Sequence, residues 1–144
     1  MNVTKRKLFL VVIALAEASI GLGLLFLPFV PFALLLGLES VTVDAIFVGR
    51  IAGAALLAIG VASWIARTDE LSRSLFGLLI GILTYNTAVS ILLVYAGAIL
   101  KMTGVMLWPT VAFHAFLAVW GGLLLRDIPS EHHRETADNR RADP

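Results

Sequence analysis

The sequence predicts an all-α, polytopic membrane protein, a bundle of four transmembrane helices with both chain ends in the cytoplasm. The first observation is that 59% of its 144 residues are hydrophobic, with a mean hydropathy of +0.92. The second is that four apolar stretches reach the roughly 20 residues that a helix needs to cross a bilayer. The third is that Lys and Arg fall almost entirely on one side of the resulting four-span arrangement, nine against one.

The composition also excludes whole classes of protein. Only 15% of the residues are charged, whereas an ordinary soluble domain carries about 25%. A soluble domain of this length could not bury so much apolar surface, which excludes a water-soluble enzyme. A disordered regulator is also excluded, because such a protein needs low hydrophobicity and high charge. The absence of cysteine excludes disulfide exchange and thiolate metal sites. We therefore expect the lipid bilayer, and not nucleic acid, as the main partner.

The predicted membrane domain covers residues 8–126 and follows a short cytoplasmic segment, residues 1–7. Its first span, 8–27, ends at Pro28. The basic Lys5-Arg6-Lys7 and the following apolar run also resemble a secretory signal with a small-residue cleavage site. The apolar stretch continues well beyond such a site, so we expect a retained span.

Residues 28–44 join the first two spans and are predicted less sharply. Pro28 and Pro31 open this apolar segment, and Glu39 and Asp44 lie near its end. A kinked extension of the first helix and a short helix at the outer face both remain open.

Charged residues separate the later spans, which are predicted at 45–66, 74–99 and 104–125. Arg67 to Glu70 closes the second span, and Lys101 lies between the third and fourth. Residues 127–144 form a polar cytoplasmic tail that is predicted to be disordered. Its His132-His133 pair lacks a partner cluster and is interpreted as solvated, so no metal site is expected.

The orientation follows from the distribution of the basic residues, because loops that stay in the cytoplasm are enriched in Lys and Arg. Lys101 alone lies on the opposite side, and Arg50 lies within a span. The nine residues on the cytoplasmic side are Lys5, Arg6, Lys7, Arg67, Arg73, Arg126, Arg134, Arg140 and Arg141.

Small residues indicate where the helices pack, since they let transmembrane backbones approach closely. The second span has alanine at every fourth position, and GxxxG pairs occur in two spans. These residues are Ala54, Ala58, Ala62 and Ala66, with Gly49 and Gly53, and Gly77 and Gly81. Ordinary packing within one bundle is favoured over homodimerisation, and the pattern alone does not separate the two.

Each span carries a polar residue at a similar depth. At about 1.5 Å per residue, Glu17 lies about 14 Å and Asn86 about 18 Å from the cytoplasmic side. From the outer side, Arg50 lies about 8 Å and His114 about 15 Å deep. An unpaired charge in hydrocarbon costs at least about 2.5 kcal/mol, so we expect Glu17 to pair with Arg50. Tyr85 lies beside Asn86 in the sequence and joins this predicted inward-facing cluster.

Some of these residues carry a family pattern. The second span contains Gly49-Arg50, Gly53, Gly60, Trp64 and Arg67, and the later spans contain Tyr85-Asn86, Leu107-Trp108-Pro109 and His114. This pattern, which extends over most of residues 8–126, resembles the DoxX-like superfamily of small four-helix bacterial membrane proteins. The resemblance implies a four-helix bundle in the bacterial cytoplasmic membrane. Some relatives are subunits of membrane oxidoreductases that work with quinone, which would be the one cofactor to consider.

The polar cluster has two interpretations. It can be an inert staple that holds the spans in register, or a pocket at the midplane, because intramembrane ionisable groups commonly mark function. We favour a non-enzymatic component, with no catalytic residue, that binds a small lipophilic or anionic ligand or serves as an accessory subunit. Arg50 would contact the anion or carbonyl, Glu17 would be its counter-charge, and His114 a hydrogen-bond or proton partner.

Two alternatives differ in class. One is a proton-coupled small-molecule transporter that uses Glu17, although Arg50 would oppose a cation in such a site. The other is a quinone-linked oxidoreductase subunit, in which the quinone and not the protein carries the electrons. A homo-oligomer or a larger membrane complex is compatible with each of these functions.

Overall fold

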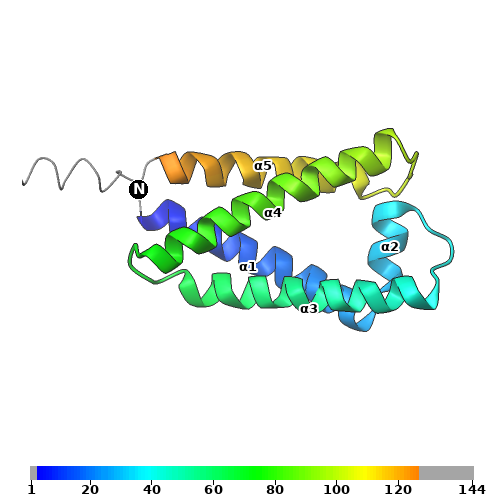
Figure 1. Ribbon diagram of the computed structural model, residues 1–144, viewed down its shortest axis with the longest axis horizontal. Coiled ribbons are helices and arrows are strands. Elements are labelled where there is room, and N and C mark those ends of the chain that lie inside the picture. The colour runs from blue at the N-terminus through cyan, green and yellow to red at the C-terminus, as the bar shows by residue number, and fades with distance from the viewer. Residues whose placement is uncertain (1–2, 127–144) are drawn as a thin grey trace, which may run out of the picture.

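The computed structural model describes residues 3–126, and this part of the chain folds into five helices without a strand (Figure 1). In chain order they are α1 (Val3–Phe26), α2 (Phe29–Leu36), α3 (Val43–Ala66), α4 (Arg73–Ala98) and α5 (Leu107–Arg126). The all-α prediction is confirmed. The predicted tail of residues 127–144, with its two histidines, lies outside the described residues.

Four of the helices have the properties of membrane spans. α1, α3, α4 and α5 contain 20 to 26 residues each and are long and apolar enough to cross a bilayer. They coincide with the four predicted spans, as in a multi-pass membrane protein. α1 begins at Val3 instead of residue 8, so the basic residues 5–7 belong to its first turns. Lys and Arg are good helix formers, which lets the helix extend beyond its apolar stretch.

The ends of the helices follow from local sequence. The side chain of Thr42 accepts a hydrogen bond from the backbone N–H of Ala45, at 3.3 Å, and begins α3. Ser72 caps α4 in the same way through the N–H of Leu75, at 3.2 Å. Such caps satisfy backbone donors that have no partner in the first turn.

The long helices form two antiparallel pairs, α1 with α3 and α4 with α5, and contacts between the pairs are much fewer (Figure 1). Glycines bring α1 and α3 together. A Cβ atom on Gly53 would lie 2.8 Å from the carbonyl oxygen of Gly21, and one on Gly60 would lie 2.9 Å from the backbone nitrogen of Ala18. Neither position can hold a larger residue without moving a backbone.

The alanine row of α3 is not the packing face that the sequence suggested. Ala54, Ala58 and Ala62 are exposed, and only Ala66 is buried. The buried face lies about 100° around the helix, at the glycines, because glycine allows a closer backbone approach than alanine. The prediction is also wrong for the glycine pair of α4, Gly77 and Gly81, since a Cβ on either would meet nothing within 4 Å.

The hydrophobic core joins all four long helices at one end of the bundle. It combines the first half of α1 with the last half of α3, the first half of α4 and the last half of α5. Its buried members are Phe9, Leu10, Ile13, Ala66, Leu75, Leu79, Ile82, Leu117 and Leu124. Towards the other end the two pairs diverge (Figure 1).

α2 crosses the wide end of the bundle, which settles the conformation of the segment after Pro28 as a separate short helix. It ends at Gly37, whose φ of 73° is left-handed and favours glycine. The backbone N–H of Met106 donates to the carbonyl of Leu34, at 2.9 Å. A Cβ on Gly104 would lie 2.2 Å from the carbonyl of Leu35. α2 is therefore held against the loop that precedes α5.

Candidate ligand-binding cavity

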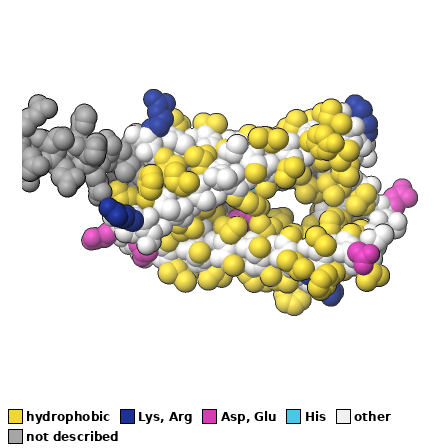
Figure 2. Space-filling model, viewed as in Figure 1, with side chains coloured by type: hydrophobic (Ala, Val, Ile, Leu, Met, Phe, Trp, Pro, Cys, Tyr) yellow, Lys and Arg dark blue, Asp and Glu magenta, His cyan; other side chains and the backbone are white. Residues whose placement is uncertain are grey.

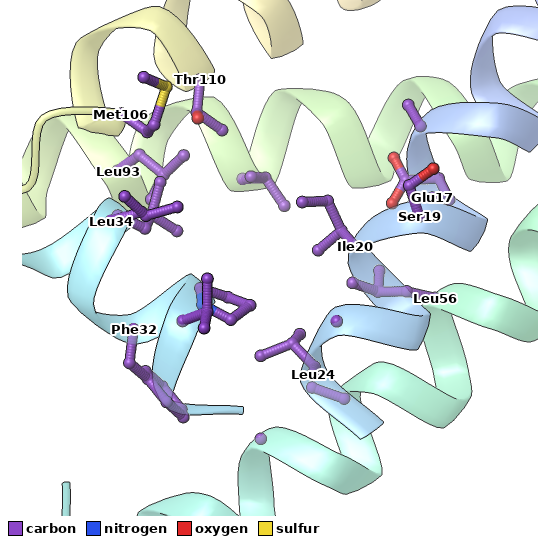
Figure 3. Close-up of a pocket in the computed structure, with 18 of the residues that line it drawn as sticks. Glu17, Ser19, Ile20, Leu24, Phe32, Leu34, Leu56, Leu93, Met106 and Thr110 are labelled. Atoms are coloured by element: carbon purple, nitrogen blue, oxygen red, sulfur yellow. The ribbon is translucent and has the colours of Figure 1, made fainter. Parts of the chain in front are cut away.

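A cavity of about 800 Å³ lies between the two helix pairs, in the half of the bundle that the core leaves open. The space-filling view shows a hollow there, on a surface that is mainly hydrophobic between its two ends (Figure 2). All five helices contribute walls, and most of the lining side chains are aliphatic or aromatic. In the close-up, Ile20 and Leu24 of α1 face Phe32 and Leu34 of α2 across the space (Figure 3).

Three polar side chains border the inner end of the cavity: Glu17 of α1, Tyr85 of α4 and His114 of α5. On α4 and α5, the lining residues nearest the core are Tyr85 and His114. On α1, Glu17 is within one residue of the lining residue nearest the core. Ser19 also borders the cavity, but its hydroxyl donates to the carbonyl of Leu15 in its own helix, at 2.7 Å. Thr110 of α5 lines the other end, beside Met106 (Figure 3), and the remaining polar groups are gathered at the inner end of a long apolar space.

Glu17 is buried, with 3% of its surface exposed, and connects the two helix pairs. The phenolic O–H of Tyr85 donates to its Oε2 at 3.2 Å. Its other oxygen, Oε1, has no hydrogen-bond partner among the described residues. A buried oxygen without a partner is costly, and an ionisable group at membrane depth commonly marks a functional site.

His114 and Asn86 join α4 to α5. The amide nitrogen of Asn86 donates to the carbonyl of Ile82 at 2.8 Å, which orients its Oδ1 as an acceptor. That Oδ1 lies 2.8 Å from Nδ1 of His114, so Nδ1 must carry the proton. Neutral His114 therefore keeps Nε2 as an acceptor. Asn86 is fully buried and does not border the cavity.

Tyr85 connects the two polar contacts. Its ring meets the imidazole of His114 edge to face, with centroids 5.8 Å apart. Glu17, Tyr85, His114 and Asn86 thus form one continuous group across α1, α4 and α5, and the structure brings these four predicted residues together.

Arg50 is the exception, and its predicted pairing with Glu17 is wrong. Its side chain is exposed on α3, and it is not among the residues that line the cavity. Arg50 does share a helix face with the alanine row, as the spacing indicates, but that face is the outer one. Gly49, one residue earlier, turns towards Phe32 of α2. Arg50 therefore cannot serve as the anion or carbonyl contact of this site.

The sequence analysis missed the part that α2 plays. Six of its eight residues line the cavity, namely Val30, Pro31, Phe32, Leu34, Leu35 and Leu36. None of them is buried in the core. The only sequence signal was an apolar segment too short to span the bilayer and begun by proline, which is compatible with a helix that lies across the bundle.

Within residues 3–126, no group of three His, Cys, Asp or Glu side chains is placed to hold a metal ion. Comparisons with protein-family models, with curated proteins and with solved structures find no match to this chain. The class that the fold and the cavity define is therefore a four-span helical bundle with an apolar cavity and a buried carboxyl group at its inner end.

Proposed function

We propose that this protein binds a small lipophilic molecule between its two helix pairs, as a non-enzymatic ligand-binding or accessory component of a membrane. The observation that carries the proposal is the cavity of about 800 Å³, with apolar walls and one carboxylate oxygen left without a partner. Typical small-molecule pockets measure about 300–1,000 Å³ and combine apolar walls with a few polar groups that orient the ligand.

The ligand is expected to enter from the lipid. Ile20, Leu34 and Met106 line the cavity and are 44–50% exposed, so the cavity is not closed off from the surroundings of the bundle. Apolar helices that span a bilayer are surrounded by acyl chains over most of their length, which favours entry from hydrocarbon. A lipophilic molecule already dissolved in the bilayer could then reach the carboxyl group of Glu17 without crossing a polar region.

We further propose that the end of the bundle with the core faces the cytoplasm. Lys5, Lys7, Arg67, Arg73 and Arg126 gather there, at the ends of four helices. Lys101 lies in the loop at the other end. The positive-inside bias supports this orientation, with both termini inside and the cavity in the outer leaflet. The resemblance to the DoxX-like superfamily, which rests on sequence motifs, supports the bacterial cytoplasmic membrane as the location.

The side chains that line the cavity favour some of the alternatives over others. Within residues 3–126, no Lys or Arg side chain lines the cavity, which disfavours an anionic ligand. A proton-coupled transporter remains the second candidate, because Glu17 borders the cavity and Arg50 does not oppose a cation there. The core fills the other half of the bundle. A ligand can therefore bind in the cavity without a structural change, whereas its transport across the membrane would require the core to open.

Photolabelling tests the proposed binding. The protein in lipid nanodiscs is incubated with a dodecanol that carries a diazirine in its chain, irradiated, and digested for mass spectrometry. We expect saturable labelling of cavity-lining residues such as Leu24 and Leu93. Ile20→Trp, which places a larger side chain in the cavity, should reduce this labelling at least about fivefold. Leu22→Trp, on the same helix but outside the lining, is the control. Labelling spread evenly over the lipid-facing residues would refute the proposal.

A further inference from the structure

The polar end of the cavity offers hydrogen-bond acceptors and no free donor. The O–H of Tyr85 is engaged by Oε2 of Glu17, and the Nδ1–H of His114 by Asn86. The acceptors that have no donor among the described residues are Oε1 of Glu17, which is itself buried, Nε2 of His114 and the oxygen lone pairs of Tyr85, and all three residues border the cavity. All three are acceptors when the imidazole is neutral and the carboxyl group is ionised. A ligand head without an N–H or O–H group would leave them unpaired.

The charge of Glu17 also favours a ligand head that donates hydrogen bonds. Glu17 has no Lys or Arg partner in the cavity, and the described part of the chain gives Oε1 no hydrogen bond. Asn86 supplies no charge, and Arg50 is exposed on the outer side of α3. A cationic head group would supply the missing counter-charge, and its N–H groups would form charge-assisted hydrogen bonds, which are stronger than neutral ones.

The shape of the cavity indicates how the rest of the ligand is accommodated. On α1 the lining extends from Ala16 to Leu24, about 12 Å along the helix axis at 1.5 Å per residue. Beyond Glu17 and Ser19 this wall is apolar, and α2 faces it with Phe32 and Leu34 (Figure 3). A single alkyl chain fits an elongated, apolar space of this kind, with its head at Glu17 and its tail towards α2.

We propose that the cavity selects a single-chain amphiphile with a primary ammonium head, for which the carboxyl group of Glu17 is the counter-charge and Glu17, His114 and Tyr85 supply the hydrogen-bond acceptors. An ammonium group has three N–H donors, one for each of these acceptors. The inference rests on the proposed function, since it names the class of ligand for the same cavity.

A head-group series tests this selectivity on the unaltered protein. Dodecylamine, dodecanol, dodecanoate and dodecyltrimethylammonium compete with the diazirine dodecanol at equal mole fractions in the nanodisc. We expect dodecylamine to compete at least about tenfold better than dodecanol, as one charged hydrogen bond provides. Dodecanoate should compete least. Dodecyltrimethylammonium, which has the charge but no N–H, should also compete less well than the amine.

The outcomes separate this inference from the proposed function. If the diazirine probe labels the cavity but the amine competes no better than the alcohol or the trimethylammonium compound, the inference is wrong and the proposed function stands. If the probe does not label the cavity, the proposed function itself fails. Because the series uses the wild-type chain, it gives an answer even if a variant does not fold.

Glu17→Gln provides the residue-level test. The substitution keeps the shape of the side chain and removes its charge, so the preference for the amine over the alcohol should fall by about tenfold. Glu39→Gln is the matched control, because Glu39 is exposed and lies outside the cavity lining. It should leave the preference as in the wild type. An undiminished preference in a folded Glu17→Gln protein would overturn the assignment.

Discussion

At the residue scale, the cluster of Glu17, Tyr85, Asn86 and His114 contains two side-chain hydrogen bonds. The bond between Asn86 and His114 joins α4 to α5 in the manner of a staple, and it leaves Nε2 of His114 without a partner among the described residues. Glu17 keeps an oxygen without a partner beside the cavity. Under the proposed function, the two interpretations that the sequence left open would apply to different contacts of the same cluster.

Removing the amide of Asn86 should destabilise the α4–α5 pair. Asn86→Leu keeps the volume and leaves the Nδ1–H of His114 without its acceptor. We expect a loss of about 1–2 kcal/mol in the free energy of unfolding, the range of strong hydrogen bonds between transmembrane helices. Equilibrium unfolding in mixed detergent micelles measures it.

Thr87→Ala is the control for this experiment. Thr87 is exposed on α4, and its hydroxyl bonds only to Leu83 of the same helix. Its replacement should cost less than about 0.5 kcal/mol. An equal cost for both variants would mean that the Asn86–His114 contact contributes nothing specific.

At the scale of the helices, close backbone approach decides which face of a span is inside. α3 turns its glycines and not its alanines towards α1, and Gly21 meets Gly53 with backbone against backbone. α4 has a glycine pair of the same spacing that meets nothing. A GxxxG motif indicates that two helices could approach, but the partner helix determines whether they do.

Gly53→Ala should therefore be destabilising and Gly77→Ala should not. The added Cβ at Gly53 would lie 2.8 Å from a backbone oxygen of α1 and force the pair apart, at a cost of about 1–3 kcal/mol. At Gly77 the space is open, so alanine should be neutral or stabilise the helix by up to about 1 kcal/mol. Thermal unfolding in detergent compares the two. If Gly77→Ala destabilised the protein, the face of α4 at Gly77 would have to contact a further partner.

At the scale of the whole molecule, the protein consists of two helix pairs that share a core at one end and separate at the other. The core includes residues from all four long helices, and α2 crosses the separated end (Figure 1). This division places the packed half on the side with the basic residues and the cavity on the other side. The orientation in the membrane then decides which leaflet would supply the proposed ligand.

Labelling from outside the cell tests this orientation. Because the sequence has no cysteine, a single introduced thiol can be labelled without removing native ones. Thr103→Cys and Thr68→Cys place single thiols in exposed loops at opposite ends of the bundle. In intact bacterial cells, a membrane-impermeant maleimide should label the residue-103 variant and reach the residue-68 variant only after lysis. The reverse pattern would place the cavity in the inner leaflet.

The sequence by itself determined the number of spans and their approximate ends. These are local properties, because span length and apolar content depend only on neighbours in the chain. It also selected Glu17, Tyr85, Asn86 and His114, together with Arg50, as a cluster, since polar residues in hydrocarbon are expected to face inward.

Only the tertiary structure decided which faces of the helices meet, that Arg50 lies outside, and that α2 forms a wall of the cavity. In a soluble protein the hydrophobic stripe reveals the buried face of a helix. In a membrane, lipid and core are equally apolar, so hydrophobicity does not distinguish them and close packing makes the choice. That physical difference explains why the spans could be predicted from the sequence, whereas the cavity between them could not.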